Sequence, residues 1–239
     1  MSHERTHDLV EDGTRTVAPL RVGFHFDVMC PWAYQTSRWI REVRRTVPLD
    51  IDWRFFSLEE INRTEGKKHP WEREWSYGWG MMRVAAMLRR ESMNACDRFY
   101  EAAGRALHEE SRKPHRPEVA EEICRELGFD PSVVRAAIDD PSTHDEVHAD
   151  HDAVVRRGGF GVPTLVFPGD RHVYGPVVAP APTGQDALDL WDLTVAYSRV
   201  PHLYELKTPK TDADMSHIAE VFRPYLEARD WESREKPAR

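Results

Sequence analysis

The feature that most constrains this chain is a strand, a sharp turn and a helix in direct succession over residues 21–45. A strand with one buried face is expected from the alternating apolar residues Val22, Phe24, Phe26 and Val28. Pro31 suits a first helical position, because its ring fixes φ near the helical value and its missing N–H would have no partner there. The sequence therefore predicts a helix that begins at Pro31, with Cys30 as its N-cap.

A cysteine at a helix N-cap faces the unpaired N–H groups of the first turn and the positive end of the helix dipole. Both favour the thiolate, so we predict a pKa for Cys30 below the free value of about 8.5. This makes Cys30 a candidate nucleophile. The alternative is a buried, inert cysteine, which is the expected state of Cys96 and Cys124 in their helical patterns.

The rest of the chain predicts an α/β protein. Residues 49–58 alternate as a second strand, which should pair in parallel with the first through a right-handed crossover. Residues 59–157 follow helical periodicity instead. Strand character returns at 163–167 and 171–174, joined by a Pro-Gly-Asp turn, and is followed by a helix over 184–198. One more helix is predicted over Met215–Leu226.

The turn also carries a resemblance to a known family. Cys30-Pro31-Trp32-Ala33 resembles the C-P-W-C motif of the DsbA-like branch of the thioredoxin superfamily. The longer string from Asp27 to Trp32, with Thr36-Ser37-Arg38-Trp39-Ile40, is similar to the actinobacterial mycothiol-dependent nitroreductase family. The resemblance extends over about residues 20 to 210. The second cysteine of the motif falls on Ala33, which excludes a disulfide within it.

A second motif, Gly161-Val162-Pro163-Thr164, lies at a predicted strand start. The resemblance implies a cis peptide bond at Pro163, with Val162, Pro163 and Thr164 forming a docking surface for a partner thiol or disulfide beside Cys30. The alternative is an ordinary trans proline that opens an edge strand.

The fold class implied is α/β, a thioredoxin-like fold with a large all-helical insertion of the DsbA type. We divide the chain into four parts. They are a flexible N-terminal extension (1–18), a discontinuous thioredoxin-like domain (19–58 and 158–206), a helical insertion (59–157) and a C-terminal extension (207–239).

The function implied is that of a thiol-dependent oxidoreductase with a single active-site cysteine. Cys30 would attack a disulfide or an electrophile, or hold a low-molecular-weight thiol as a mixed disulfide that a second thiol resolves. In the family that thiol is mycothiol, with glutathione as the other candidate, and nitroaromatics are reduced without flavin. We expect neither flavin nor metal. Two alternatives stay open: a glutathione-transferase-kappa-like or isomerase-like enzyme that activates a cofactor thiol, and a non-catalytic binding module.

Further residues are candidates for the site around Cys30. Asn62 follows the second strand, near whose end ligands of α/β folds collect, although a turn asparagine is the alternative. The resemblance places a histidine near His151. His144, His148 and His151 share one helical face, for which a solvated face is favoured over a metal site. Trp71, Trp75 and Trp79 with Tyr77 and Met81 are interpreted as core or interface packing at helical spacing, in preference to a substrate lid.

The charge of the chain limits which classes of binding partner are expected. The 239 residues carry a formal charge of −8, which argues against nucleic acid and anionic membrane as partners. Three widely spaced cysteines make neither a disulfide framework nor a zinc site. The first sixteen residues lack the apolar region of a signal peptide, so a cytoplasmic protein is expected. The sequence leaves a homodimer open.

Overall fold

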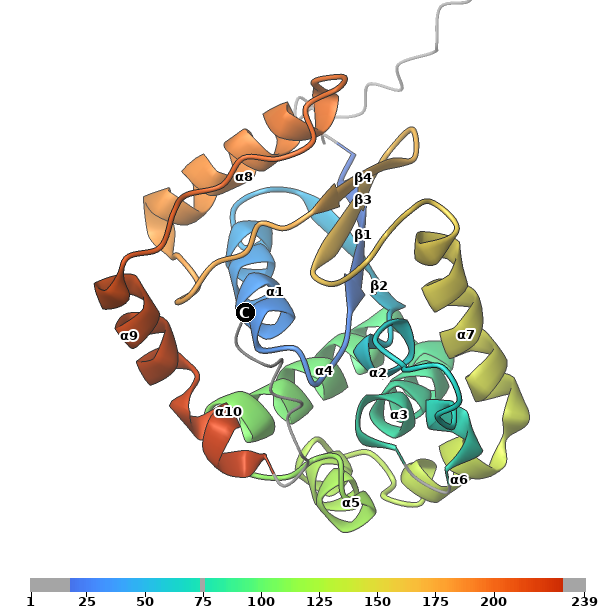
Figure 1. Ribbon diagram of the computed structural model, residues 1–239. Coiled ribbons are helices and arrows are strands. Elements are labelled where there is room, and N and C mark those ends of the chain that lie inside the picture. Colours follow the sequence, from blue (N-terminus) through green and yellow to red (C-terminus); the bar gives the residue numbers. More distant parts are fainter. Residues whose placement is uncertain (1–17, 74–75, 230–239) are drawn as a thin grey trace, which may run out of the picture.

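The computed structural model describes residues 18–73 and 76–229, and within them helices surround a single sheet (Figure 1). The elements in chain order are β1 (Leu20–Phe26), α1 (Pro31–Arg44), β2 (Leu49–Phe55), α2 (Leu58–Ile61), η1 (Pro70–Glu72), α3 (Tyr77–Glu91), α4 (Met93–His108), α5 (Pro117–Glu126), α6 (Val133–Asp139), α7 (Pro141–Val155), β3 (Thr164–Phe167), β4 (Arg171–Tyr174), α8 (Gly184–Arg199), α9 (Asp212–Val221) and α10 (Arg223–Ala228). None of the helices in these ranges is long and apolar enough to cross a membrane. Residues 1–17 and 230–239 of the two predicted extensions lie outside the described residues.

The strand order in the sheet is β2-β1-β3-β4. β1 pairs in parallel with β2, as the β-α-β reading predicts, and antiparallel with β3, which in turn pairs antiparallel with β4. In the β1–β2 register Phe24 lies opposite Trp53 and Phe26 opposite Phe55, and all four side chains are fully buried. Large aromatic pairs of this kind fix the register, because a slip by one residue would turn them outward. The strand that leads to Cys30 is therefore held on both sides.

Helix α1 packs between the sheet and α8. The indole N–H of Trp39 donates a hydrogen bond to the carbonyl of Ala187 at 2.9 Å, and its ring lies 6.2 Å from that of Trp191. Trp39 is fully buried. Because α1 packs against α8, α4 and β2, its N-terminal end is held in place relative to the sheet.

The segment between the second and third strands is helical, as predicted, and comprises α2 to α7. The predicted extension of the second strand to Leu58 is wrong, since β2 ends at Phe55 and α2 begins at Leu58. The physical reason is Ser57, whose hydroxyl accepts the Glu60 backbone N–H at 3.1 Å and so caps a new helix. Helix α7 returns to the sheet and packs on β2.

The C-terminal region departs most from prediction. The single helix predicted over Met215–Leu226 is instead two helices, α9 and α10, which meet at Phe222. Pro224 explains the break, because a proline inside a helix lacks the N–H donor and clashes with the carbonyl four residues earlier. From α8 the chain runs without helix or strand through residues 200–211, continues into α9 and ends with α10 against α4 (Figure 1).

Candidate thiol site

Cys30 lies at the junction of β1 and α1. It is the N-cap of α1, Pro31 is the first helical residue, and the Cys30 sulfur accepts a hydrogen bond from the Ala33 backbone N–H at 3.4 Å. The backbone N–H of Cys30 donates to the carbonyl of Asp27 at 3.0 Å, which closes the turn. The predicted N-cap position is therefore confirmed.

The predicted depression of the Cys30 pKa is wrong. Cys30 is only 4% exposed, and burial raises the pKa of its thiol to about 12. The Ala33 N–H lowers this pKa but does not outweigh the loss of water around the sulfur, and the nearby Asp27 carboxyl raises the pKa further. In this structure burial therefore favours the thiol form of Cys30 over the thiolate.

Asp27 braces the turn from inside. Its side chain is fully buried and accepts two backbone N–H groups, from Met29 at 3.0 Å and from Leu58 at 2.8 Å. Burial raises the pKa of its carboxyl to about 7, although both hydrogen bonds lower it. Gly78 makes room for it, because a Cβ on Gly78 would lie 2.5 Å from Asp27 Oδ1. Sequence reasoning named Asp27 only as a neighbour of the cysteine, and no local signal pointed to Gly78.

The proline loop lies directly against the cysteine. The Cys30 thiol donates to the carbonyl of Val162 at 3.6 Å, and the Val162–Pro163 peptide bond is cis. The carbonyl of Pro163 accepts the N–H of Gly175 at 2.9 Å. Thr164 is buried at the start of β3, and its hydroxyl donates to the carbonyl of Gly161 at 2.8 Å. The structure thus brings the two predicted motifs together at the sulfur.

No second sulfur is within the motif, since Ala33 is a fully buried alanine in the first turn of α1. Cys96 in α4 and Cys124 in α5 are also fully buried. All three cysteines are free thiols. Burial raises the pKa of Cys96 and of Cys124 to about 12, which fits the expected inert role.

Two aromatic residues of the C-terminal region, Phe222 and Tyr225, pack near the β1–α1 turn, and sequence reasoning missed them. Half-buried Trp32 meets the ring of Phe222 edge to face, with centroids 4.7 Å apart. Tyr225 lies beside His108, with ring centroids 5.2 Å apart. Burial raises the pKa of Tyr225 to about 12, and the nearby Cys30 contributes in the same direction. The His108 ring hydrogen-bonds the carbonyl of Val28 through Nε2 at 2.8 Å. Burial lowers the pKa of His108 to about 4, so the ring is neutral at pH 7.

Two other predicted site residues lie on different elements, Asn62 at the end of α2 and His151 in α7. Asn62 is exposed at the end of α2, where its amide donates to the carbonyl of Leu58 at 2.9 Å. His151 is buried, and its Nδ1 accepts the N–H of Ser57 at 3.2 Å. Among the hydrogen bonds of the described residues, none joins either side chain to Cys30, so their roles remain predictions.

The expected solvated histidine face on α7 is wrong. His151 is buried, and half-buried His144 and His148 pack against Trp71, with ring centroids 5.3 Å away in each case. Trp79 closes the same cluster at 4.7 Å from Trp71. The interpretation of these tryptophans as packing holds, but they come from separate elements, η1 and α3, and not from one helix.

Trp75, the third tryptophan of the predicted stripe, lies outside the described residues. No three His, Cys, Asp or Glu side chains are arranged to hold a metal ion in the part of the chain that the structure describes.

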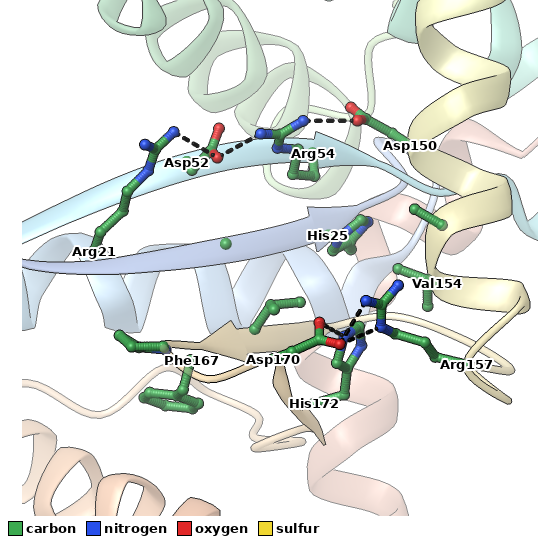
Figure 2. Close-up of a pocket in the computed structure, with 14 residues that line it drawn as sticks. Arg21, His25, Asp52, Arg54, Asp150, Val154, Arg157, Phe167, Asp170 and His172 are labelled. Carbon is green, nitrogen blue, oxygen red and sulfur yellow. Dashed lines mark hydrogen bonds and ion pairs between the residues drawn. The ribbon is translucent and has the colours of Figure 1, made fainter.

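A cavity of about 500 Å³ lies elsewhere, between α7 and a face of the sheet (Figure 2). Its charges are paired, with Arg54 bridging Asp52 at 2.7 Å and Asp150 at 3.0 Å, and with Arg157 bound to Asp170 at 2.7 Å. None of the predicted site residues lines it. It is therefore separate from the thiol site.

The chain is similar to a known protein family and to a curated protein. A family model described as Rv2466c-like, mycothiol-dependent nitroreductase Rv2466c, matches residues 29–208. The uncharacterized protein Rv2286c of Mycobacterium tuberculosis is 53% identical over 212 residues, which are 89% of this chain and 92% of that protein.

Similar solved structures show the fold alone, because their identity is low. A 2-hydroxychromene-2-carboxylate isomerase has a TM-score of 0.55 and 16% identity, covering 74% of this chain and 95% of its own. A probable DsbA oxidoreductase from Streptomyces coelicolor has a TM-score of 0.53 and 19% identity, covering 82% and 97%. The predicted thioredoxin-like fold with a helical insertion is thereby confirmed. With its cysteine turn and proline loop inside the matched range, the chain belongs to the Rv2466c-like mycothiol-dependent nitroreductase family.

Proposed function

We propose that this chain is a cytoplasmic thiol-dependent oxidoreductase that works through Cys30 alone and uses mycothiol as its small-molecule thiol. The observation that carries the proposal is the position of the Cys30 sulfur, 3.4 Å from the Ala33 N–H and 3.6 Å from the Val162 carbonyl. An incoming sulfur that is to exchange with Cys30 has to align with it, and the bare backbone beside Pro163 gives it a place to dock. Family membership supports mycothiol as the thiol.

The chemistry is thiol–disulfide exchange. The Cys30 thiolate attacks one sulfur of a disulfide, a new S–S bond forms, and the other sulfur leaves as a thiolate. Because residue 33 is alanine, a second external thiol must attack the mixed disulfide and release Cys30. With a nitroaromatic substrate, two mycothiol thiols become one disulfide, and the substrate takes up the two electrons and two protons.

Mass spectrometry after incubation with mycothiol disulfide tests the proposal. We expect one mycothiol adduct per chain, mapped to the peptide that contains Cys30. The adduct should be absent from Cys30→Ser and retained in the matched variant Cys96→Ser. Glutathione disulfide in parallel tells which thiol is preferred. An oxidised monomer with a bridge from Cys30 to Cys96 or Cys124 would contradict the monothiol cycle.

A second candidate is a transferase-like or isomerase-like enzyme that activates a cofactor thiol. The high pKa of Cys30 favours it, because a cysteine that keeps its proton is a poor nucleophile. The N–H groups at the start of α1 would then stabilise the thiolate of the cosubstrate. This alternative predicts that mycothiol binds without forming a covalent bond to Cys30. It also predicts that a Cys30→Ser variant retains activity.

A further inference from the structure

The family match ends at residue 208, directly before a C-terminal segment that contacts Trp32, two residues after Cys30. We call residues 209–228, which contain α9 and α10, the lid. The lid ends with α10 against α4 (Figure 1), and its Phe222 contacts Trp32 in the first turn of α1. Residues 209–228 lie outside the range that the family model matches.

The lid meets the site through aromatic contacts. Phe222 is 8% exposed and stands nearly perpendicular to the Trp32 ring, with an interplanar angle of 87° and centroids 4.7 Å apart. Tyr225 follows one helical turn later beside His108, and buried Ala228 seats α10. Edge-to-face geometry at this spacing is a favourable aromatic pairing. Phe222 therefore occupies the apolar space against the Trp32 ring, two residues after Cys30 in the chain.

The part of the lid before Phe222, and the connection that leads to it, are loosely attached. Residues 200–211 form no helix or strand and are exposed except at residue 203. Helix α9 contains no buried residue. A hydrogen bond from the Ser111 hydroxyl to Glu227 at 3.2 Å is exposed. A segment with few buried apolar contacts opens at lower free energy than the core, and the extended connection gives it room to swing.

We infer that the lid must leave the β1–α1 turn before Cys30 reacts, and that Phe222 is an internal stand-in for the ring of a planar aromatic substrate on Trp32. Phe222 is then a specificity-determining residue. An aromatic electrophile competes with Phe222 for the Trp32 face, whereas a small aliphatic reagent gains only from exposure of the sulfur. The aromatic part of this inference rests on the proposed function, but the lid itself does not.

Covalent labelling of Cys30 in the full-length chain tests both parts. Iodoacetamide is the aliphatic probe, and chlorodinitrobenzene is the aromatic one. In each reaction the Cys30 thiolate forms an S–C bond and displaces a halide, which is iodide from iodoacetamide and chloride from chlorodinitrobenzene. The rate is followed by mapping the Cys30 peptide, which separates it from Cys96 and Cys124.

Phe222→Ala should raise both labelling rates on the order of tenfold, because the lid loses the burial of one aromatic ring. Chlorodinitrobenzene should gain more than iodoacetamide, since the ring place on Trp32 becomes free. Leu226→Ala is the matched control, because Leu226 is an exposed residue of the same helix, and its rates should equal those of the wild type. Ala228→Glu, which unseats α10 without touching Trp32, should also raise both rates.

Each outcome decides a part of the inference. Unchanged rates in folded Phe222→Ala and Ala228→Glu, with wild-type circular dichroism, would overturn the lid. Equal gains for the two probes would overturn the aromatic place while the lid stands. Faster labelling without any mycothiol adduct in wild type or variant would remove the proposed function and leave the lid intact.

Discussion

The two walls around Cys30 are built in opposite ways. The inner wall is the β1–α1 turn, where Asp27 and Val28 are fully buried and Gly78 leaves no room for a Cβ. The outer wall is the lid, which touches the site through Phe222 and Tyr225 and contains a helix without buried residues. One wall fixes the sulfur and the other covers it. The contrast suggests that the site opens on one side only, with the geometry of the thiol unchanged.

The largest expected contrast is between one phenylalanine of each wall. Phe26 is fully buried in β1 and stacks on Tyr100 with ring centroids 3.8 Å apart, so Phe26→Ala should lower the free energy of unfolding by about 4 kcal/mol. Phe222→Ala should lower it by about 1 kcal/mol or less, because the lid opens before the core unfolds. Urea denaturation measures both. Equal losses would mean that the lid is part of the core.

The buried Asp27 carboxyl gives the inner wall a pH dependence. Its pKa is about 7 in the folded chain and about 3.9 in the unfolded chain. Between these values the folded state keeps a proton that the unfolded state has lost. The free energy of unfolding should therefore fall by a few kcal/mol as pH rises from about 4 to about 7, and the Asp27 contribution should be flat above that.

Two histidines oppose this slope and have to be separated from it. Burial lowers the pKa of His25 and of His108 to about 4, so each favours folding more as pH rises from about 4 to about 6.5. Urea denaturation of wild type and Asp27→Asn across this range isolates the Asp27 carboxyl, since the histidines and the other titratable groups are present in both proteins. Parallel profiles for the two proteins would show that Asp27 titrates normally.

A smaller effect is expected where α3 approaches the turn. Gly78→Ala places a methyl group 2.5 Å from Asp27 Oδ1, and the clash outweighs the gain in helix propensity. We expect a net loss of about 2 kcal/mol in the free energy of unfolding, measured by urea denaturation. Glu91→Ala, at the exposed end of the same helix, should change it by less than about 0.5 kcal/mol. A fully stable Gly78→Ala would mean that the turn can shift.

Much of the fold could be predicted from the sequence, because its signals are local. The alternation in β1, the proline at the start of α1 and the Pro-Gly-Asp turn between β3 and β4 each depend on a few adjacent residues. The end of β2 was missed because the hydroxyl of Ser57 acts only when the chain turns into α2. The break at Phe222 is hidden in the sequence because the apolar period continues through Pro224.

The site was predicted in its motifs but not in its environment. Cys30 and Val162 meet as the two motifs suggest. The high pKa of Cys30 does not follow from the local sequence, because burial depends on residues far away in the chain, among them Val162. Distance along the chain also hides the contacts of Phe222 with Trp32 and of Tyr225 with His108. Helix-dipole reasoning gives the sign of one contribution to a pKa, whereas burial depends on the whole chain.

The smallest contrast concerns one helix cap on each wall. Ser57 is fully buried and caps α2 beside Asp27, so Ser57→Ala should lower the free energy of unfolding by about 1 kcal/mol. Thr211 caps α9, where its hydroxyl accepts the Asp214 N–H at 3.2 Å and the Asp214 carboxylate accepts the Thr211 N–H at 2.7 Å. Thr211→Ala removes a cap of similar strength. Its effect should be confined to faster amide hydrogen exchange in α9, with less than about 0.5 kcal/mol in global stability. A global loss as large as that of Ser57→Ala would show that the lid unfolds only together with the core, and that Cys30 cannot be uncovered without unfolding.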